Sequence, residues 1–219
     1  MVLVNKDTKL HDIVIGEPSV ITVLGRFGIT LGVGDTTVRQ VCDERGIDPA
    51  LFLAILNTFI NPDYFPENAL RACDLTQLTQ YMRKTDDHYL NVLIPNVERH
   101  FNLLVRQSRE PSSNLELMLR FFLEVKAELT ARISRDSETL SQAAAGLQDL
   151  KATSLEGDAV EEKLSDLISM FVIHLKGDYD ANLCHAVLFA IANLLNDIRQ
   201  NNRIRTRILM PVLSASSAS

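Results

Sequence analysis

Polar and charged residues interrupt the apolar faces of several predicted helices in this sequence. Glu128 and Arg132 lie one helical turn apart, Asn201 and Arg205 lie one turn apart in a later helix, and Asp86 lies in an earlier one. Taken singly, each could lie at the edge of its stripe and extend to water, as long side chains often do. Two i,i+4 polar pairs with a third carboxylate favour a site inside a helical bundle, where bundle proteins place their metal ligands.

The composition of this set determines which chemistry it can support. Asp86 and Glu128 are acids, Arg132 and Arg205 are bases, and Asn201 can add hydrogen bonds. An arginine side chain has no lone pair to give to a metal and stays protonated in proteins. We therefore predict a charged cluster that fixes the helices in register without metal, and we expect Arg132→Ala or Glu128→Ala to destabilise the fold severely.

Four long amphipathic helices carry these residues. Their apolar residues recur at steps of three and four, which is typical of a helix with one buried face. Pro95 lies inside the first of them and should bend it. Four such helices with short connections bury their apolar stripes most simply as an antiparallel bundle. The predicted ranges are 75–105, 114–150, 160–175 and 181–209.

The first seventy residues read as short helices joined by glycine-containing turns. Residues 19–27 precede the turn GITLGVGD, and Thr36 or Thr37 could cap a helix that reaches Glu44. Asp48-Pro49 combines an N-cap residue with proline at the first helical position. The fold class is therefore all-α, and the predicted domains are a small helical domain (1–70), a four-helix bundle (71–213) and a flexible tail (214–219).

Composition excludes several classes of function. With 219 residues, of which 46% are hydrophobic, the chain can build one substantial core with a small satellite domain. Three widely spaced cysteines fit a reducing cytoplasm, and we see neither a signal sequence nor a membrane-spanning run. A net charge of −6 provides no field that gathers nucleic acid. We predict no nucleic-acid or membrane binding by this chain.

Several segments resemble the iron–sulfur cluster repair di-iron family in order and spacing. They are RFGITLGVGDTTVRQVCDERGID, then LTQYMRKTDDHYLNVLIPNVERH, and later VEEKLSDLISMFVIHL and NNRIRTRILMPVL. The resemblance implies a small helical N-terminal domain followed by a hemerythrin-like bundle, and a related group fuses both parts to a LuxR-type helix-turn-helix. The family's Cys-Cys-Gly-Gly turn is replaced here by residues 31–34, Leu-Gly-Val-Gly.

The resemblance also places the family's metal ligands. Aligned by the flanking apolar residues, the first-helix histidine falls at Asp86, and the third-helix histidine falls near Gly157. The His/Glu pair of the second helix falls at Glu128 and Arg132, and the corresponding pair of the fourth helix falls at Asn201 and Arg205. No histidine remains at these positions, and arginine stands at both positions of the bridging carboxylates. We therefore expect no metal and no cofactor.

Three hypotheses for the function follow. The first is a non-catalytic, metal-free hemerythrin-like module with a regulatory or sensing role, acting on an unknown protein or small-molecule partner. The second is the input domain of a LuxR-type transcription regulator. The third is a di-iron protein of iron–sulfur cluster repair or of oxygen or nitric oxide handling, against which the arginines argue. A homodimer is left open.

Overall fold

The computed structural model describes residues 3–66, 74–108, 114–144 and 159–217. The regular secondary structure of these residues is helical, with no strand among them and only an isolated bridge between Lys9 and Thr37. The prediction of an all-α fold is confirmed for this part of the chain. The structure divides into two compact units, the first formed by Met1–Thr85, Thr139–Thr153 and Gln200–Ser219 and the second by Asp86–Glu138 and Ser154–Arg199.

The first unit contains the short N-terminal helices and the C-terminal helical segment. Helix α4 is apolar around most of its circumference and contacts α2, α3 and the π-helical turn η4. Its Phe52 is fully buried and meets Phe27 edge-on at 4.9 Å between ring centroids. The helices of this unit are α1 (Leu10–Gly16), α2 (Val20–Arg26), α3 (Val38–Arg45), α4 (Pro49–Ile60), most of α5 (Leu75–His88), η4 (Arg205–Leu209) and α10 (Met210–Ser217).

Local sequence signals set the ends of two helices in this unit. Thr37 caps α3 with a reciprocal capping box, in which the Gln40 backbone N–H donates to the Thr37 hydroxyl and the Thr37 N–H donates to the Gln40 side chain. Asp48 accepts a hydrogen bond of 2.8 Å from the Ala50 N–H, and Pro49 opens α4. Both predicted helix starts are confirmed.

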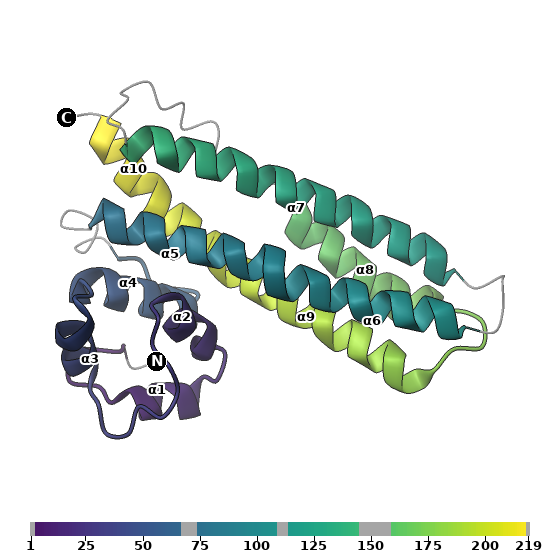
Figure 1. Cartoon of the computed structure of the whole chain (residues 1–219), viewed down its shortest axis with the longest axis horizontal. Helices are drawn as coiled ribbons and strands as arrows, with labels where there is room; N and C mark the ends of the chain where they lie inside the picture. Colours follow the sequence, from purple (N-terminus) through teal and green to yellow (C-terminus); the bar gives the residue numbers. More distant parts are fainter. Residues whose placement is uncertain (1–2, 67–73, 109–113, 145–158, 218–219) are drawn as a thin grey trace. The chain divides into compact units, whose positions relative to one another are not determined.

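The second unit is built from four helical segments that share one apolar core. They are η2 with α6 (Tyr89–Leu93 and Ile94–Gln107), α7 (Leu115–Ala144), α8 (Val160–His174) and α9 (Ala181–Ile204), of which α7 and α9 end in the first unit. Figure 1 shows these helices running alongside one another. Phe101 meets Phe122 and Phe171 in the core at centroid distances of 6.1 and 5.3 Å.

Two π-helical turns interrupt the long helices, each directly before a proline. In η2 the Ile94 N–H bonds to the Tyr89 carbonyl, and in η4 the Met210 N–H bonds to the Arg205 carbonyl. Pro95 and Pro211 follow one residue later. Proline has no N–H and its ring collides with the preceding turn, so a wider turn accommodates it without ending the helix. The predicted disturbance at Pro95 therefore takes the form of a π turn.

Other boundaries differ from the sequence prediction or lie outside the described residues. The predicted boundary at residue 70 falls within residues 67–73, and the predicted far end of the second bundle helix falls within residues 145–158, neither of which the structure describes. Helix α10 extends to Ser217, into the segment predicted as a flexible tail from residue 214. Helix α1 was not predicted.

Candidate functional site

Glu128 lies at the edge of α7 and pairs with a residue that the sequence analysis did not include. Its carboxylate accepts a hydrogen bond from the Lys163 ammonium on α8 and one of 3.3 Å from the Ala159 backbone N–H. The hydrogen bond from Lys163 lowers the pKa of Glu128 below its ordinary value. Because the two side chains are 27% and 36% exposed, this is a partly solvated ion pair rather than a buried one.

Arg132 lies one turn further along α7 and is only 4% exposed. Asp136, one turn beyond Arg132, is equally buried at 4%. The i,i+4 spacing places an arginine and a carboxylate on the same buried face of one helix. The second unit therefore encloses charged groups in a core that is otherwise apolar.

The first unit contains the other predicted pair. Asn201 is 1% exposed on α9, and Arg205 is 5% exposed at the start of η4. Both are therefore buried, as expected for residues on the inner side of their helix. Asp86 is half-buried in the second unit, and Gly157 lies outside the described residues.

The predicted site residues are divided between the two units. Asp86, Glu128 and Arg132 belong to the second unit, whereas Asn201 and Arg205 belong to the first. Their convergence into one cluster therefore stays a prediction. Within the second unit, Glu128 is partly exposed and bound to Lys163, whereas Arg132 is buried.

Neighbouring arginines on the C-terminal segment bind backbone carbonyls of the first unit. Arg203 donates to the Thr58 and Phe59 carbonyls at 3.3 and 2.7 Å, at the C-terminal end of α4. Arg207 donates to the Tyr64 carbonyl at 2.7 Å. Helix C-termini present unpaired carbonyls with partial negative charge, which cationic side chains satisfy. Arg203 thus joins the C-terminal segment to the end of α4, and Arg207 joins it to the loop that follows α4.

The donor set does not fit a di-iron centre. Among the described residues, no group of three or more His, Cys, Asp or Glu side chains is placed to hold a metal ion. Of the predicted positions in the second unit, Glu128 is engaged by an ammonium group and Arg132 has no lone pair to donate. Iron–carboxylate sites in helical bundles need anionic bridges and imidazoles from facing helices.

An open hollow lies on the second unit beside the π turn η2. Its volume is about 630 Å³, and Val92, Leu93 and Pro95 supply its apolar lining. Its polar lining comes from His88, Asn91, Asn96, Arg99 and, on α9, Asn193. The Arg99 guanidinium donates to the Asn96 side-chain oxygen at 2.9 Å. Most of its polar groups are neutral amides, so the hollow has no strong preference for a charged ligand.

A second cleft lies in the first unit, where α2, α3 and α5 meet. Arg26 is 7% exposed there and lies over the Tyr81 ring, with 5.9 Å from its guanidinium carbon to the ring centroid. Arg45 lines the same cleft and donates to the Gly28 carbonyl at 2.7 Å. The cleft is therefore lined by groups that already bond within the protein.

Sequence reasoning missed three charged residues that are buried in the described part of the chain. They are Arg26, Asp136 and Asp197, the last of which is 4% exposed in the second unit. The signal for Asp136 was present, because it lies one turn after Arg132 and three residues after the buried Ile133. Arg26 carried no such signal, since it ends a short helix where arginines commonly reach solvent.

Comparisons with protein-family models, with curated proteins and with solved structures find no match to this chain. The resemblance to the iron–sulfur cluster repair di-iron family therefore stays a prediction from the sequence.

Proposed function

We propose that this chain is a non-catalytic, metal-free hemerythrin-like module with a regulatory or sensing role. In this proposal a small helical N-terminal domain precedes an antiparallel four-helix bundle. The four helical segments of the second unit, which share one apolar core, support the bundle part. The short helices gathered around α4 support the N-terminal part.

The burial of arginine at the former ligand positions carries the proposal. Arg132 and Arg205, at the positions that the resemblance assigns to bridging carboxylates, are 4% and 5% exposed. A surface arginine could swing aside and leave room for iron, but a buried one occupies that volume and brings positive charge into a low-dielectric interior. A ferrous ion at either position would be repelled rather than neutralised.

Binding of nucleic acid by this chain alone is not part of the proposal. Of the arginines near the C-terminus, Arg203 and Arg207 donate to backbone carbonyls, and Arg199 pairs with Glu161 at 3.0 Å. Guanidinium groups bound in this way are not free to neutralise phosphates.

Residence in a reducing cytoplasm is likewise proposed, in keeping with the free, buried thiols of Cys42 and Cys184.

Metal analysis tests the proposal directly. The full chain is incubated with ferrous iron under anaerobic conditions, desalted, and analysed for iron per chain alongside its melting temperature. We expect far less than one iron per chain and an unchanged melting temperature. Stoichiometric iron that raises the melting temperature would show that a metal site survives, and would favour the di-iron hypothesis.

A further inference from the structure

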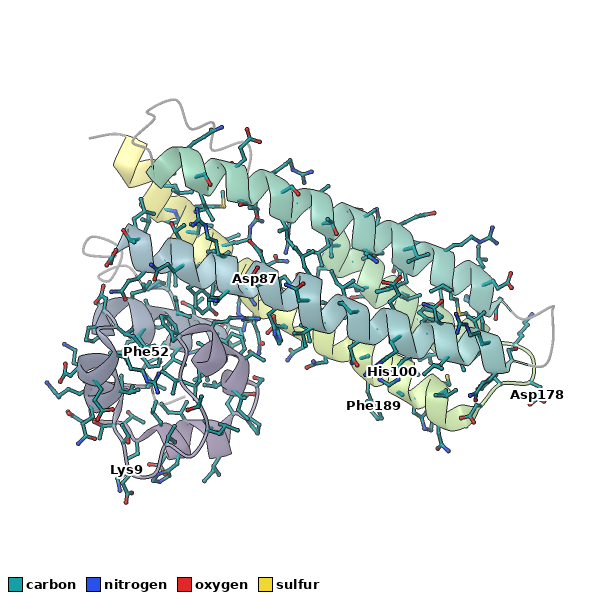
Figure 2. The ribbon with its side chains drawn as sticks, in the orientation of Figure 1. Lys9, Phe52, Asp87, His100, Asp178 and Phe189 are labelled. Carbon is teal, nitrogen blue, oxygen red and sulfur yellow. The ribbon has the colours of Figure 1, made fainter. Side chains whose placement is uncertain are left out.

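The second unit presents an exposed aromatic side chain next to the open hollow. Phe189 on α9 is 75% exposed, and Figure 2 shows it on the outer side of that helix. Asn193, one turn further along α9, lines the hollow together with Val92, Leu93 and Pro95. A protruding ring and a partly apolar recess therefore lie within one helical turn of each other on the same face, here called the α6/α9 face.

Charge along the α6/α9 face changes sign from one end to the other. Asp87 is exposed at the end of α5, before the hollow, whereas Arg99 and Arg106 are exposed on α6, at and beyond it. No ion pair involving Asp87 or Arg106 occurs within the described part of the chain. Asp87 at one end of this strip and Arg106 at the other are complementary to the same pair in a copy turned end for end.

We propose that the α6/α9 face binds a second copy of this chain in a two-fold symmetric dimer. In an isologous interface, residue i of one copy contacts residue j of the other and the reverse contact forms as well. An antiparallel arrangement places Phe189 of each copy in the hollow of its partner. The same arrangement brings Asp87 of each copy towards Arg106 of the other. The dimer therefore contains this pair of opposite charges twice.

The two sets of contacts require the same symmetry axis. Helices α6 and α9 run antiparallel in Figure 1, so Phe189, one turn before Asn193, lies on the Arg106 side of the hollow. Seating Phe189 in the partner's hollow therefore puts the axis between the hollow and Phe189, at about the level of residue 97. Asp87 and Arg106 lie on either side of that level at nearly equal separation along the helix.

The size of the face fits a modest dimer interface. The strip from Asp87 to Arg106 is about 30 Å long at the helical rise per residue, and two neighbouring helices make it about 20 Å wide. The resulting area of about 600 Å² per copy lies towards the low end for specific interfaces. A dimer that dissociates on dilution is therefore expected, with Phe189 as its central aromatic anchor.

Sedimentation velocity over a range of concentrations tests the proposal with the full chain. The chain should sediment as a dimer at high concentration, and Phe189→Glu should weaken association by at least tenfold. Val172→Glu is the matched control, because Val172 is 73% exposed on α8 of the same unit. A chain that stays monomeric throughout would overturn the proposal, as would a dimer that Val172→Glu disrupts and Phe189→Glu does not.

A charge exchange tests the predicted geometry separately. Asp87→Arg and Arg106→Asp should each weaken association, because each places like charges opposite one another in both halves of the interface. The double variant exchanges both partners and should recover most of the affinity. A double variant weaker than either single variant would exclude the antiparallel pairing. Circular dichroism of each variant establishes that the helices are intact, and none of these measurements depends on the presence of metal.

Discussion

Glu128 and Arg132 lie one turn apart on α7, but their burial differs. The sequence alone predicted severe destabilisation when either is replaced by alanine. Because Glu128 forms a partly solvated pair with Lys163, we expect Glu128→Ala to cost only about 0.2–1 kcal/mol in the free energy of unfolding. Arg132 is 4% exposed, and Arg132→Ala should cost about 3–5 kcal/mol because it strands buried polar partners.

Urea denaturation of the two variants measures this difference. Arg120→Ala serves as the control, since Arg120 is exposed on the same helix and should change stability little. Equal losses for Glu128→Ala and Arg132→Ala would contradict the distinction drawn from burial.

The contribution of the Glu128–Lys163 pair to stability also depends on pH. Since the pKa of Glu128 is lowered in the folded state, its contribution is present above the pKa of the unfolded carboxyl and is lost on acidification.

The pKa of the Cys42 thiol on α3 is shifted upwards, in the opposite direction to that of Glu128. It is 1% exposed, and burial, with smaller effects from Asp43 and Asp48, raises the pKa of its thiol to about 11. We expect iodoacetamide to label Cys42 at pH 8 only when urea unfolds the chain, whereas a cysteine introduced at the exposed Ser169 reacts at once. Peptide mass spectrometry reads out both sites, and rapid labelling of native Cys42 would show that α3 opens readily.

Because the pKa of Cys42 is raised in the folded state, we expect the stability of the fold to decrease at alkaline pH. Folding keeps the Cys42 thiol protonated, so its contribution is complete below the pKa of the unfolded thiol. It is lost as the pH rises towards about 11.

Helix α4 is joined to the N-terminal segment by one buried amide. Asn57, 5% exposed, accepts from the Val4 N–H at 2.8 Å and donates to the Val4 carbonyl at 3.0 Å. Asn57→Ala removes both hydrogen bonds and leaves buried groups unpaired, which should lower stability by about 1–3 kcal/mol. Thermal denaturation measures the loss, and limited proteolysis should detect release of the segment before α1. Gln80→Ala, at an exposed amide on α5, should have neither effect.

Helix starts were predictable where a capping residue marks them. Thr37 and Asp48 mark the starts of α3 and α4, because their side chains accept capping hydrogen bonds from backbone N–H groups within three residues. Helix α1 lacks such a mark, because the side chain of Lys9 at its N-cap makes no capping hydrogen bond. The helix is fixed instead by burial of Leu10 and Ile13, which depends on the folded surroundings.

The candidate site was predictable in residue type but not in pairing. The apolar period identified Arg132, Asn201 and Arg205 as inward-facing, and all three are buried. It could not identify Lys163 as the partner of Glu128, since that contact joins residues on different helices. Periodicity specifies the face of a helix, but the rotation and offset between helices determine which side chains meet.

The compact units combine segments that are far apart in sequence. The first unit unites the N-terminal helices with residues 200–219, and the hydrogen bonds from Arg203 and Arg207 cross about 140 residues of chain. A domain boundary near residue 70, predicted from local composition, could not show that residues 200–219 pack in the same unit as the N-terminal helices. The C-terminal segment therefore stabilises the N-terminal helices, which the domain prediction treated as separate.

One helical stretch among the described residues, Ala181–Ser214, is long and apolar enough to cross a membrane by length and composition. Its apolar side chains Val187, Ile191 and Leu194 are buried in the core of the second unit. Insertion into a bilayer would break this core. It would also bring Asp197 and Arg205 towards the hydrocarbon, each at a cost of about 2.5–3.5 kcal/mol if placed at its centre.

We therefore expect the full chain to remain in the supernatant when it is sedimented with phosphatidylcholine vesicles. Vesicles that also contain phosphatidylserine, with and without 1 M salt, identify electrostatic adsorption, which salt removes. The folded state is checked by circular dichroism in the same buffers, because an unfolded chain would expose the apolar face of α9. Chain that stays in the pellet through high salt and alkaline carbonate would show that Ala181–Ser214 inserts. In that case the core packing of α9 would describe only one of two states of the protein.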